Sequence, residues 1–177
     1  MSDFPLPALT LVLGGAASGK SVFAERLVTQ TGRPRVYLAT AQAYDAEMAA
    51  KVAAHQSQRG AGWHTIEAPH DIATPLANAA ASQIVLLDCA TLWLSNALLA
   101  NVPAADAFNN FVNALAARTT PLVIVSNEVG AGIVPENALA RAFRNAQGAL
   151  NQAVAARADL VVNVIAGLPM VLKGRLE

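Results

Sequence analysis

The stretch LTLVLGGAASGKSVFAERLV, residues 9–28, decides the fold. Its centre, GGAASGKS at residues 14–21, matches the phosphate-loop pattern G-x-x-x-x-G-K-[ST]. A short apolar run precedes the loop and a helix-like segment follows it. This strand–loop–helix order is the context in which the pattern binds nucleotide phosphates, so a chance glycine-rich turn is the weaker interpretation.

The residue types of the loop each suit phosphate binding. Glycines let the backbone approach phosphate oxygens with its N–H groups, and the following helix N-terminus adds partial positive charge. Lys20 is expected to reach the terminal phosphates, and the hydroxyl of Ser21 to bind Mg²⁺. The loop therefore predicts a site for a nucleoside triphosphate with its metal ion.

Short apolar runs recur along the chain and alternate with helix-like segments. Continuous apolar runs are typical of strands that are buried on both faces, as in a parallel sheet. The expected strands are residues 9–13, 35–39, 84–88, 122–126 and 160–165, and the expected helices are residues 21–30, 45–58, 103–118 and 135–159. We therefore expect a single α/β domain over residues 1–177, with a mostly parallel central sheet flanked by helices.

The composition narrows the possible partners and location. The chain has 12 basic and 12 acidic side chains, and this balance argues against nucleic acid, which requires a clustered basic excess. Cys89 is the single cysteine, so no intramolecular disulfide can form, and a reducing, cytoplasmic location is expected. Polar residues interrupt the longest apolar stretches, so no transmembrane segment is expected.

Asp88 ends the buried run IVLLD, residues 84–88. A carboxylate at the carboxyl end of a central parallel strand lies where open α/β sheets bind their ligands. There it could hold Mg²⁺ or accept a proton from an attacking hydroxyl. The alternative is a helix cap, because residues 89–100 are helix-like.

His55 lies in the alanine-rich stretch DAEMAAKVAAHQSQRGAGW, residues 45–63. In a helix over 45–58, Glu47, Lys51 and His55 form one polar stripe at i, i+4 and i+8. A lone histidine on a polar helix face is usually solvated, and no neighbouring residue meets the test for a nucleophile with its base. The residues alone therefore favour a surface histidine and leave a nucleophilic role open.

Four segments together resemble one family of enzymes. They are LVLGGAASGKSVFAERL (11–27), VYLATAQAYDAEMAAKVAAHQSQRGAGWHTIEAP (36–69), LLDCATLWLSN (86–96) and the stretch that begins IVSNEVGAGIVPEN (124–137). The chain resembles the bifunctional adenosylcobinamide kinase / adenosylcobinamide-phosphate guanylyltransferases of cobalamin biosynthesis over nearly its whole length. The resemblance implies a RecA-like P-loop NTPase fold, a homotrimer, and ATP, GTP and Mg²⁺ as cofactors.

The same resemblance implies two reactions and their residues. A kinase reaction phosphorylates adenosylcobinamide, and a guanylyltransferase reaction passes GMP from GTP, through a covalent guanylyl-histidine, to adenosylcobinamide phosphate. His55 matches the family's guanylylated histidine, beside Lys20 and Asp88 as the other catalytic residues and Ser21 and Asp88 as the metal ligands. The implied nucleotide-binding residues are Gly14, Gly15, Ala16, Ala17, Ser18, Gly19, Lys20, Ser21, Thr40, Ala41, Gln42, Gln56, Ser57, Gln58, Arg59, Glu67 and Asp88.

The chain departs from the family pattern at two places. Ala17 stands where the family commonly has arginine, and residues 60–65 read GAGWHT where the family often reads PAHWRT. These changes bear on the nucleotide contacts and on the donor preference, so two other interpretations stay open. One is an enzyme that has kept only the kinase reaction, and the other is a non-catalytic nucleotide-binding regulator.

Overall fold

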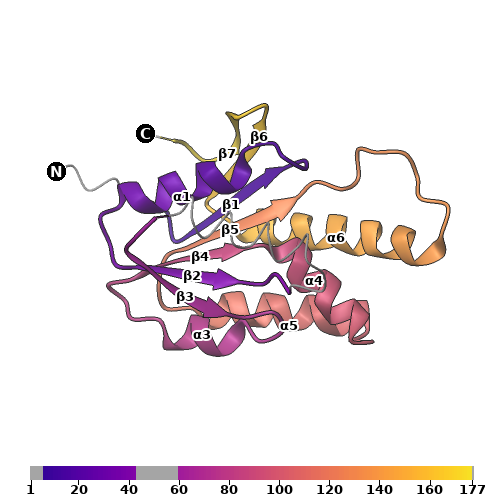
Figure 1. The fold of residues 1–177 in the computed structure, drawn as a ribbon, viewed down its shortest axis with the longest axis horizontal. Coiled ribbons are helices and arrows are strands. Elements are labelled where there is room, and N and C mark those ends of the chain that lie inside the picture. The colour runs from indigo at the N-terminus through magenta and orange to yellow at the C-terminus, as the bar shows by residue number, and fades with distance from the viewer. Residues whose placement is uncertain (1–5, 43–59, 177) are drawn as a thin grey trace.

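The computed structural model describes residues 6–42 and 60–176. Within these residues, seven strands form one sheet in the order β3-β2-β4-β5-β1-β6-β7 (Figure 1). They are β1 (Leu9–Gly14), β2 (Arg35–Ala39), β3 (Trp63–Glu67), β4 (Ile84–Asp88), β5 (Leu122–Asn127), β6 (Leu160–Ile165) and β7 (Leu168–Lys173). Strands β1 to β6 run parallel, and β7 returns antiparallel beside β6. The mostly parallel sheet predicted from the apolar runs is confirmed.

Helices cover both faces of this sheet (Figure 1). On one face α1 packs its Phe23 and Leu27 among strand residues such as Val12. On the other face Phe111 and Leu150 belong to a second core cluster built on α3, α4, α5 and α6. The helices are α1 (Lys20–Gln30), α3 (Ala73–Asn78), α4 (Ala90–Leu99), α5 (Ala104–Ala117) and α6 (Ala138–Arg157). None of these described helices has the length and apolarity needed to cross a membrane.

Strands β3 and β7, helix α3 and the start of α6 differ from the sequence-based expectation. Strands β3 and β7 were not predicted, because they lie at the two edges of the sheet and present mostly exposed side chains. Helix α6 begins at Ala138 rather than at Pro135, because the side-chain oxygen of Asn137 accepts a hydrogen bond from Ala140 N at 2.7 Å and caps the helix there. The expected helix over 45–58 lies outside the described residues.

The segment between β5 and α6 projects from the body of the molecule together with the first turns of α6 (Figure 1). Arg141 and Arg144 donate hydrogen bonds to its backbone carbonyls, at Pro135 and Gly130 among others. Ile133 on this projection is 98% exposed. The sheet and its helices therefore form the core, and the projection adds surface to it.

Candidate functional site

The phosphate loop connects the carboxyl end of β1 to α1. Gly19 has a φ of +89°, in the left-handed region that favours glycine. Gly14 lies so close to β6 that a Cβ there would come within 2.7 Å of the carbonyl oxygen of Val164. The carbonyl oxygen of Ser18 accepts a hydrogen bond from Gly167 N at 2.9 Å, in the β6–β7 turn. Backbone geometry therefore determines the shape of the loop.

Lys20 and Ser21 are the first two residues of α1. The ammonium group of Lys20 donates a hydrogen bond to the carbonyl oxygen of Gly15 at 3.0 Å, so it lies over the loop. The N–H groups of the first helical turn have no acceptor within the helix, and they suit an anionic ligand. The loop thus offers backbone donors, one cation and one hydroxyl at a single place.

Asp88 lies two strands from the phosphate loop, with β5 between them. Two inter-strand spacings of about 4.8 Å put it roughly 10 Å from β1. The helix-cap interpretation of Asp88 is wrong, because Cys89 is the N-cap residue of α4 and its Sγ accepts from Leu92 N at 3.5 Å. The Asp88 carboxylate therefore has a position suited to a ligand and not to a cap.

Thr40 braces the junction between Asp88 and α4. Its hydroxyl accepts a hydrogen bond from Cys89 N at 2.7 Å and donates one to Cys89 O at 2.8 Å. Its backbone N–H donates to Asp88 O at 3.2 Å, and its carbonyl accepts from Asn96 Nδ2 at 2.8 Å. The side chain is fully buried. Thr40, predicted to bind nucleotide, therefore uses its hydroxyl to fix the end of β4.

The pKa of the Cys89 thiol depends on its burial and on the charges around it. Burial raises the pKa of this thiol to about 12, and the negative charge of Asp88 adds to that rise. The positive charge of Lys20 acts in the opposite direction on the same pKa. The charges of Lys20 and Asp88 thus both influence the pKa of the Cys89 thiol.

Three predicted site residues at the carboxyl edge of the sheet share one face: Gly14, Asp88 and Glu67. Side chains alternate along a strand, and the residues two positions before Gly14 and Asp88 both belong to the cluster that packs on α1. Gly14 and Asp88 therefore lie on the α1 face. Glu67 pairs in register with Ala39, a member of the same cluster, so it too lies on this face. The result is a row of positions along one edge and on one face.

This row has two halves. The phosphate-loop half consists of residues 14–21 and Asp88. The outer half consists of residues 40–42 and Glu67, and Glu67 lies four strands, or about 19 Å, from β1. In the outer half Gln42 Nε2 lies 3.2 Å from His70 Nε2. The resemblance adds five more residues to the site, and all of them lie outside the described residues: His55, Gln56, Ser57, Gln58 and Arg59.

A buried polar cluster beneath the phosphate-loop half was not predicted from the sequence. Ser126 Oγ donates to Asn151 Oδ1 at 2.6 Å, and Gln147 Nε2 donates to both of these oxygen atoms at 2.9 Å. Thr91 Oγ1 lies 3.4 Å from Ser126 Oγ. The four residues come from β5, α4 and α6, and isolated polar residues within these elements give no signal that they meet. The cluster joins the end of β5 to the helices on the far face.

The described residues fit a magnesium–triphosphate complex. They contain no group of three or more His, Cys, Asp or Glu side chains that could hold a metal ion by itself. Mg²⁺ commonly takes one or two protein oxygens and completes its shell with water and substrate phosphates. The hydroxyl of Ser21 and the carboxylate of Asp88 are suitable protein oxygens on either side of β5.

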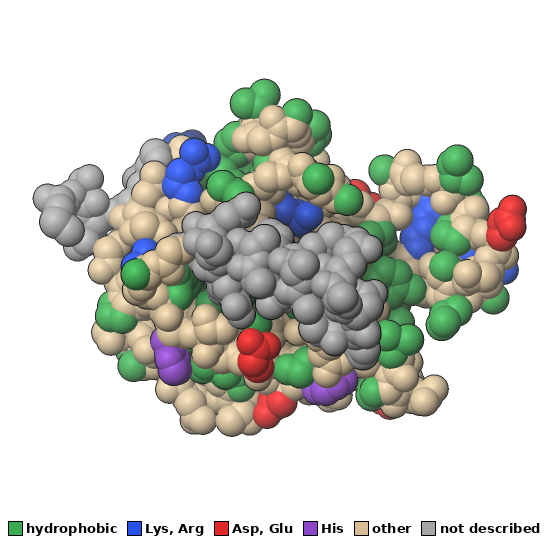
Figure 2. All heavy atoms as spheres, viewed as in Figure 1, with side chains coloured by type: hydrophobic (Ala, Val, Ile, Leu, Met, Phe, Trp, Pro, Cys, Tyr) green, Lys and Arg blue, Asp and Glu red, His purple; other side chains and the backbone are tan. Residues whose placement is uncertain are grey.

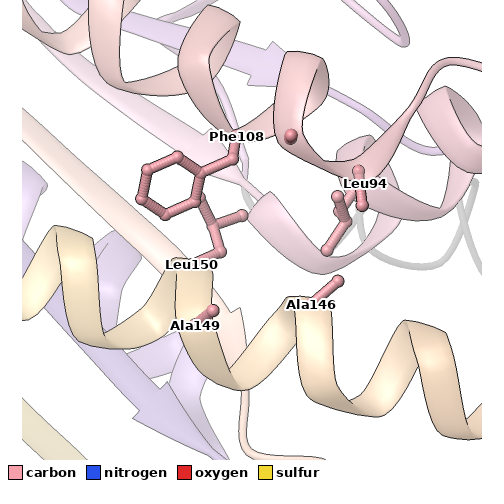
Figure 3. Close-up of a pocket in the computed structure, with 7 residues that line it drawn as sticks. Leu94, Phe108, Ala146, Ala149 and Leu150 are labelled. Carbon is pink, nitrogen blue, oxygen red and sulfur yellow. The ribbon is translucent and has the colours of Figure 1, made fainter.

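Other surfaces of the described residues fit a triphosphate less well. A cavity of about 240 Å³ between α4, α5 and α6 is lined by apolar side chains, including Leu94, Phe108 and Leu150 (Figure 3). It offers no side-chain donor for an anion. On the face drawn in Figure 2, the described Lys and Arg side chains are scattered and do not form one basic patch. The phosphate loop therefore fits an anion better than this cavity does.

Comparison with solved structures supports the fold. The flagellar accessory protein FlaH of Methanocaldococcus jannaschii superposes with a TM-score of 0.52 at 14% identity, over 95% of this chain and 79% of that one. The protein PH0250 of Pyrococcus horikoshii OT3 gives a TM-score of 0.56 at 9% identity, over 96% and 88%. Together with the loop and the sheet order, these likenesses show the RecA-like P-loop fold.

Comparison of sequences gives the family. The model of the family described as cobinamide kinase / cobinamide phosphate guanyltransferase matches residues 10–172. The bifunctional adenosylcobalamin biosynthesis protein CobP of Pseudomonas aeruginosa is 44% identical over 170 residues, which cover 93% of this chain and 96% of the relative. The corresponding CobU of Salmonella typhimurium is 39% identical over 182 residues, which cover 93% and 99%. The chain therefore belongs to the cobinamide kinase / cobinamide phosphate guanyltransferase family.

Proposed function

We propose that the protein catalyses both reactions in the family's description, as a bifunctional enzyme of cobalamin biosynthesis. It phosphorylates adenosylcobinamide with ATP or GTP and then transfers GMP from GTP to adenosylcobinamide phosphate. The observation that carries the proposal is the complete phosphate loop, with Asp88 two strands away on the same face, in a chain that matches the family from residue 10 to residue 172.

In the kinase reaction, a hydroxyl of the cobinamide attacks the γ-phosphorus of the bound nucleotide and releases the diphosphate. Phosphoryl transfer depends mostly on positioning and on charge stabilisation at the phosphate. We assign the charge stabilisation to Lys20 and to the backbone N–H groups of the loop. We assign the metal to Ser21 and Asp88, and the bracing of Asp88 to Thr40, whose backbone and hydroxyl bond to Asp88 and Cys89.

In the guanylyltransferase reaction, a neutral imidazole of His55 attacks the α-phosphorus of GTP and pyrophosphate leaves. The guanylyl group then passes from the histidine to the phosphate oxygen of the second substrate. A covalent intermediate divides this transfer into two displacements. The assignment to His55 rests on the match of residues 36–69 to the family pattern. Glu67 and residues 40–42 are assigned to the same nucleotide.

The test is covalent labelling with GTP that carries radioactive phosphorus at the α position. With Mg²⁺, the wild-type protein is expected to take up label that is stable to base and lost in acid, as a phosphorus–nitrogen bond requires. His55→Ala should take up none and keep kinase turnover, since γ-transfer uses no imidazole. His64→Ala is the matched control and should label normally, because His64 is an exposed residue of β3 that pairs with Val36 and so lies on the sheet face opposite Glu67. Equal labelling of the wild type and His55→Ala would refute the assignment.

The departure from the family pattern at residues 60–65 favours a second candidate, an enzyme that retains the kinase reaction alone. Here Arg35 donates hydrogen bonds to the carbonyls of Gly62, at 3.2 Å, and Ala61, at 3.3 Å, and lies over the Trp63 ring at 5.3 Å. Formation of cobinamide phosphate, with neither protein label nor a nucleotidylated product, would select this candidate. Nucleotide binding without turnover of either substrate would instead indicate a regulator.

The homotrimer that the resemblance implies and the expected cytoplasmic location stay predictions.

A further inference from the structure

Asn127 is the last residue of β5, the strand that lies between the phosphate-loop strand and the Asp88 strand. It pairs in register with Gly14, the first residue of the loop. The preceding residue, Ser126, points to the face of the sheet that α4 and α6 cover. There it joins the buried polar cluster. Because side chains alternate along a strand, Asn127 points to the α1 face, which also carries Asp88.

The backbone of Asn127 is held on both sides. Its N–H donates a hydrogen bond to Thr91 Oγ1 at 2.8 Å, and its carbonyl oxygen accepts one from Asn151 Nδ2 at 3.0 Å. Both partners belong to the buried polar cluster beneath the site. This cluster therefore fixes the point from which the Asn127 side chain projects toward the loop.

The side-chain oxygen of Asn127 is buried and finds no hydrogen-bond partner among the described residues. The hydroxyl of Ser18, in the loop, is also buried and also has no hydrogen-bond partner among the described residues. The two oxygens flank Gly14, since a Cβ at that position would collide with the Ser18 hydroxyl. A buried acceptor without a donor is unfavourable, so a donor brought by a ligand would satisfy it.

We propose that Asn127 is a further residue of the nucleotide site, where its side-chain oxygen accepts a hydrogen bond from a donor beside the terminal phosphate. Two such donors exist: a water molecule bound to Mg²⁺, and the hydroxyl of the acceptor substrate. With the nucleotide at the loop and Mg²⁺ at Ser21 and Asp88 as proposed, both donors would lie between the loop and Asp88, and β5 occupies that position in the sheet. The inference rests on the proposed phosphate site, and it adds a residue that the loop pattern does not contain.

The experiment compares wild type with Asn127→Ala and Asn127→Leu. Leucine has a shape close to that of asparagine and needs no donor, so it covers the case in which the alanine variant does not fold. Asn163→Ala is the matched control, because Asn163 is a part-buried asparagine of β6 between Val162 and Val164, and so lies on the opposite face. Thermal unfolding of each protein establishes that it is folded.

The first measurement is calorimetric binding of a non-hydrolysable GTP analogue and of GDP, each with Mg²⁺ and without substrate. A metal-bound water as donor predicts a loss of about 5- to 10-fold in affinity for the analogue, with GDP affinity changed less than about twofold, as expected for one hydrogen bond. The second measurement is kinase turnover at saturating nucleotide. A substrate hydroxyl as donor predicts unchanged analogue affinity and a similar fold-loss in kcat.

Unchanged analogue affinity together with unchanged kcat in a folded variant would overturn the inference. That result differs from a failure of the proposed function itself. If the wild-type protein bound no triphosphate and showed no kinase turnover, the proposed phosphate site would be wrong before any variant was compared.

Discussion

The two halves of the candidate site are held in different ways. The phosphate-loop half lies on the central strands, where glycine conformations and backbone hydrogen bonds to the β6–β7 turn fix its shape. The outer half lies on β2 and the edge strand β3, and side chains of α4 hold it. Asn96 donates to the carbonyls of Thr40, at 2.8 Å, and Pro69, at 3.0 Å, and Trp93 donates to His70 O at 2.8 Å.

This difference suggests a division of labour. Backbone donors recognise phosphate in any nucleotide, so the phosphate-loop half can serve every reaction that uses a bound triphosphate. Contacts built from side chains depend on particular residues, so the outer half can serve one reaction and one base. Apart from Thr40, whose hydrogen bonds brace Asp88, the kinase reaction should therefore depend on the phosphate-loop half, and the guanylyl transfer should depend on both halves.

The largest expected effect is that of Lys20→Ala. Removing the ammonium group takes away charge stabilisation at the phosphates, and both reactions should fall by roughly 10²- to 10³-fold. The measurements are kinase turnover and α-phosphate labelling. Lys173→Ala is the matched control, because Lys173 pairs with Val161 toward the other end of β6 and its ammonium group bonds to the carbonyls of Ala155 and Ala156. Loss of one reaction without the other would contradict a shared phosphate site.

A smaller and more selective effect is expected for Glu67→Gln. Its side chain is exposed on β3, about 19 Å from the loop strand, so it is too far away to contact the phosphates that Lys20 reaches. Guanylyl transfer should fall by about tenfold, as for the loss of a hydrogen bond to a charged group, while kinase turnover with ATP stays within about twofold. Glu136→Gln, on the exposed projection, serves as the control. Equal losses in both reactions would remove the distinction between the halves.

The phosphate-loop half could be predicted from sequence because its signals are local. The pattern of residues 14–21, the buried run before it and the run that ends at Asp88 all lie within single stretches of chain. The structure confirms those runs as β1 and β4. Apolar continuity also found β2, β5 and β6, since each is buried on both faces.

The parts of the fold and of the site that could not be predicted depend on contacts between distant parts of the chain. Strand β3 exposes His64 and Thr65 at an edge of the sheet, so it lacks the apolar run of a buried strand. The buried polar cluster joins Thr91 to Ser126 and Gln147, and these residues are neighbours only after the helices pack on the sheet. The role proposed for His55 rests on the family resemblance alone, because spacing along a polar helix stripe cannot distinguish a nucleophile from a solvated residue.

The smallest expected effect concerns Cys89, which joins the halves through its contacts with Thr40 and its peptide bond to Asp88. Its folded-state pKa is raised from an ordinary value of 9.0 to about 12. Below pH 9 the thiol is protonated in both the folded and the unfolded state, so its full contribution to stability is present. Between pH 9 and 12 the unfolded chain loses the proton first, so stability should decrease as pH rises.

At pH 10 this loss should be about 1 kcal/mol relative to pH 7.5, measured as the free energy of unfolding in urea. Cys89→Ser is the control, because a hydroxyl can still accept the cap hydrogen bond of α4 but does not titrate in this range. The serine variant should therefore lose less stability than wild type over the same pH interval, whatever its absolute stability. Equal losses would mean that burial does not raise the pKa of the thiol in the folded protein.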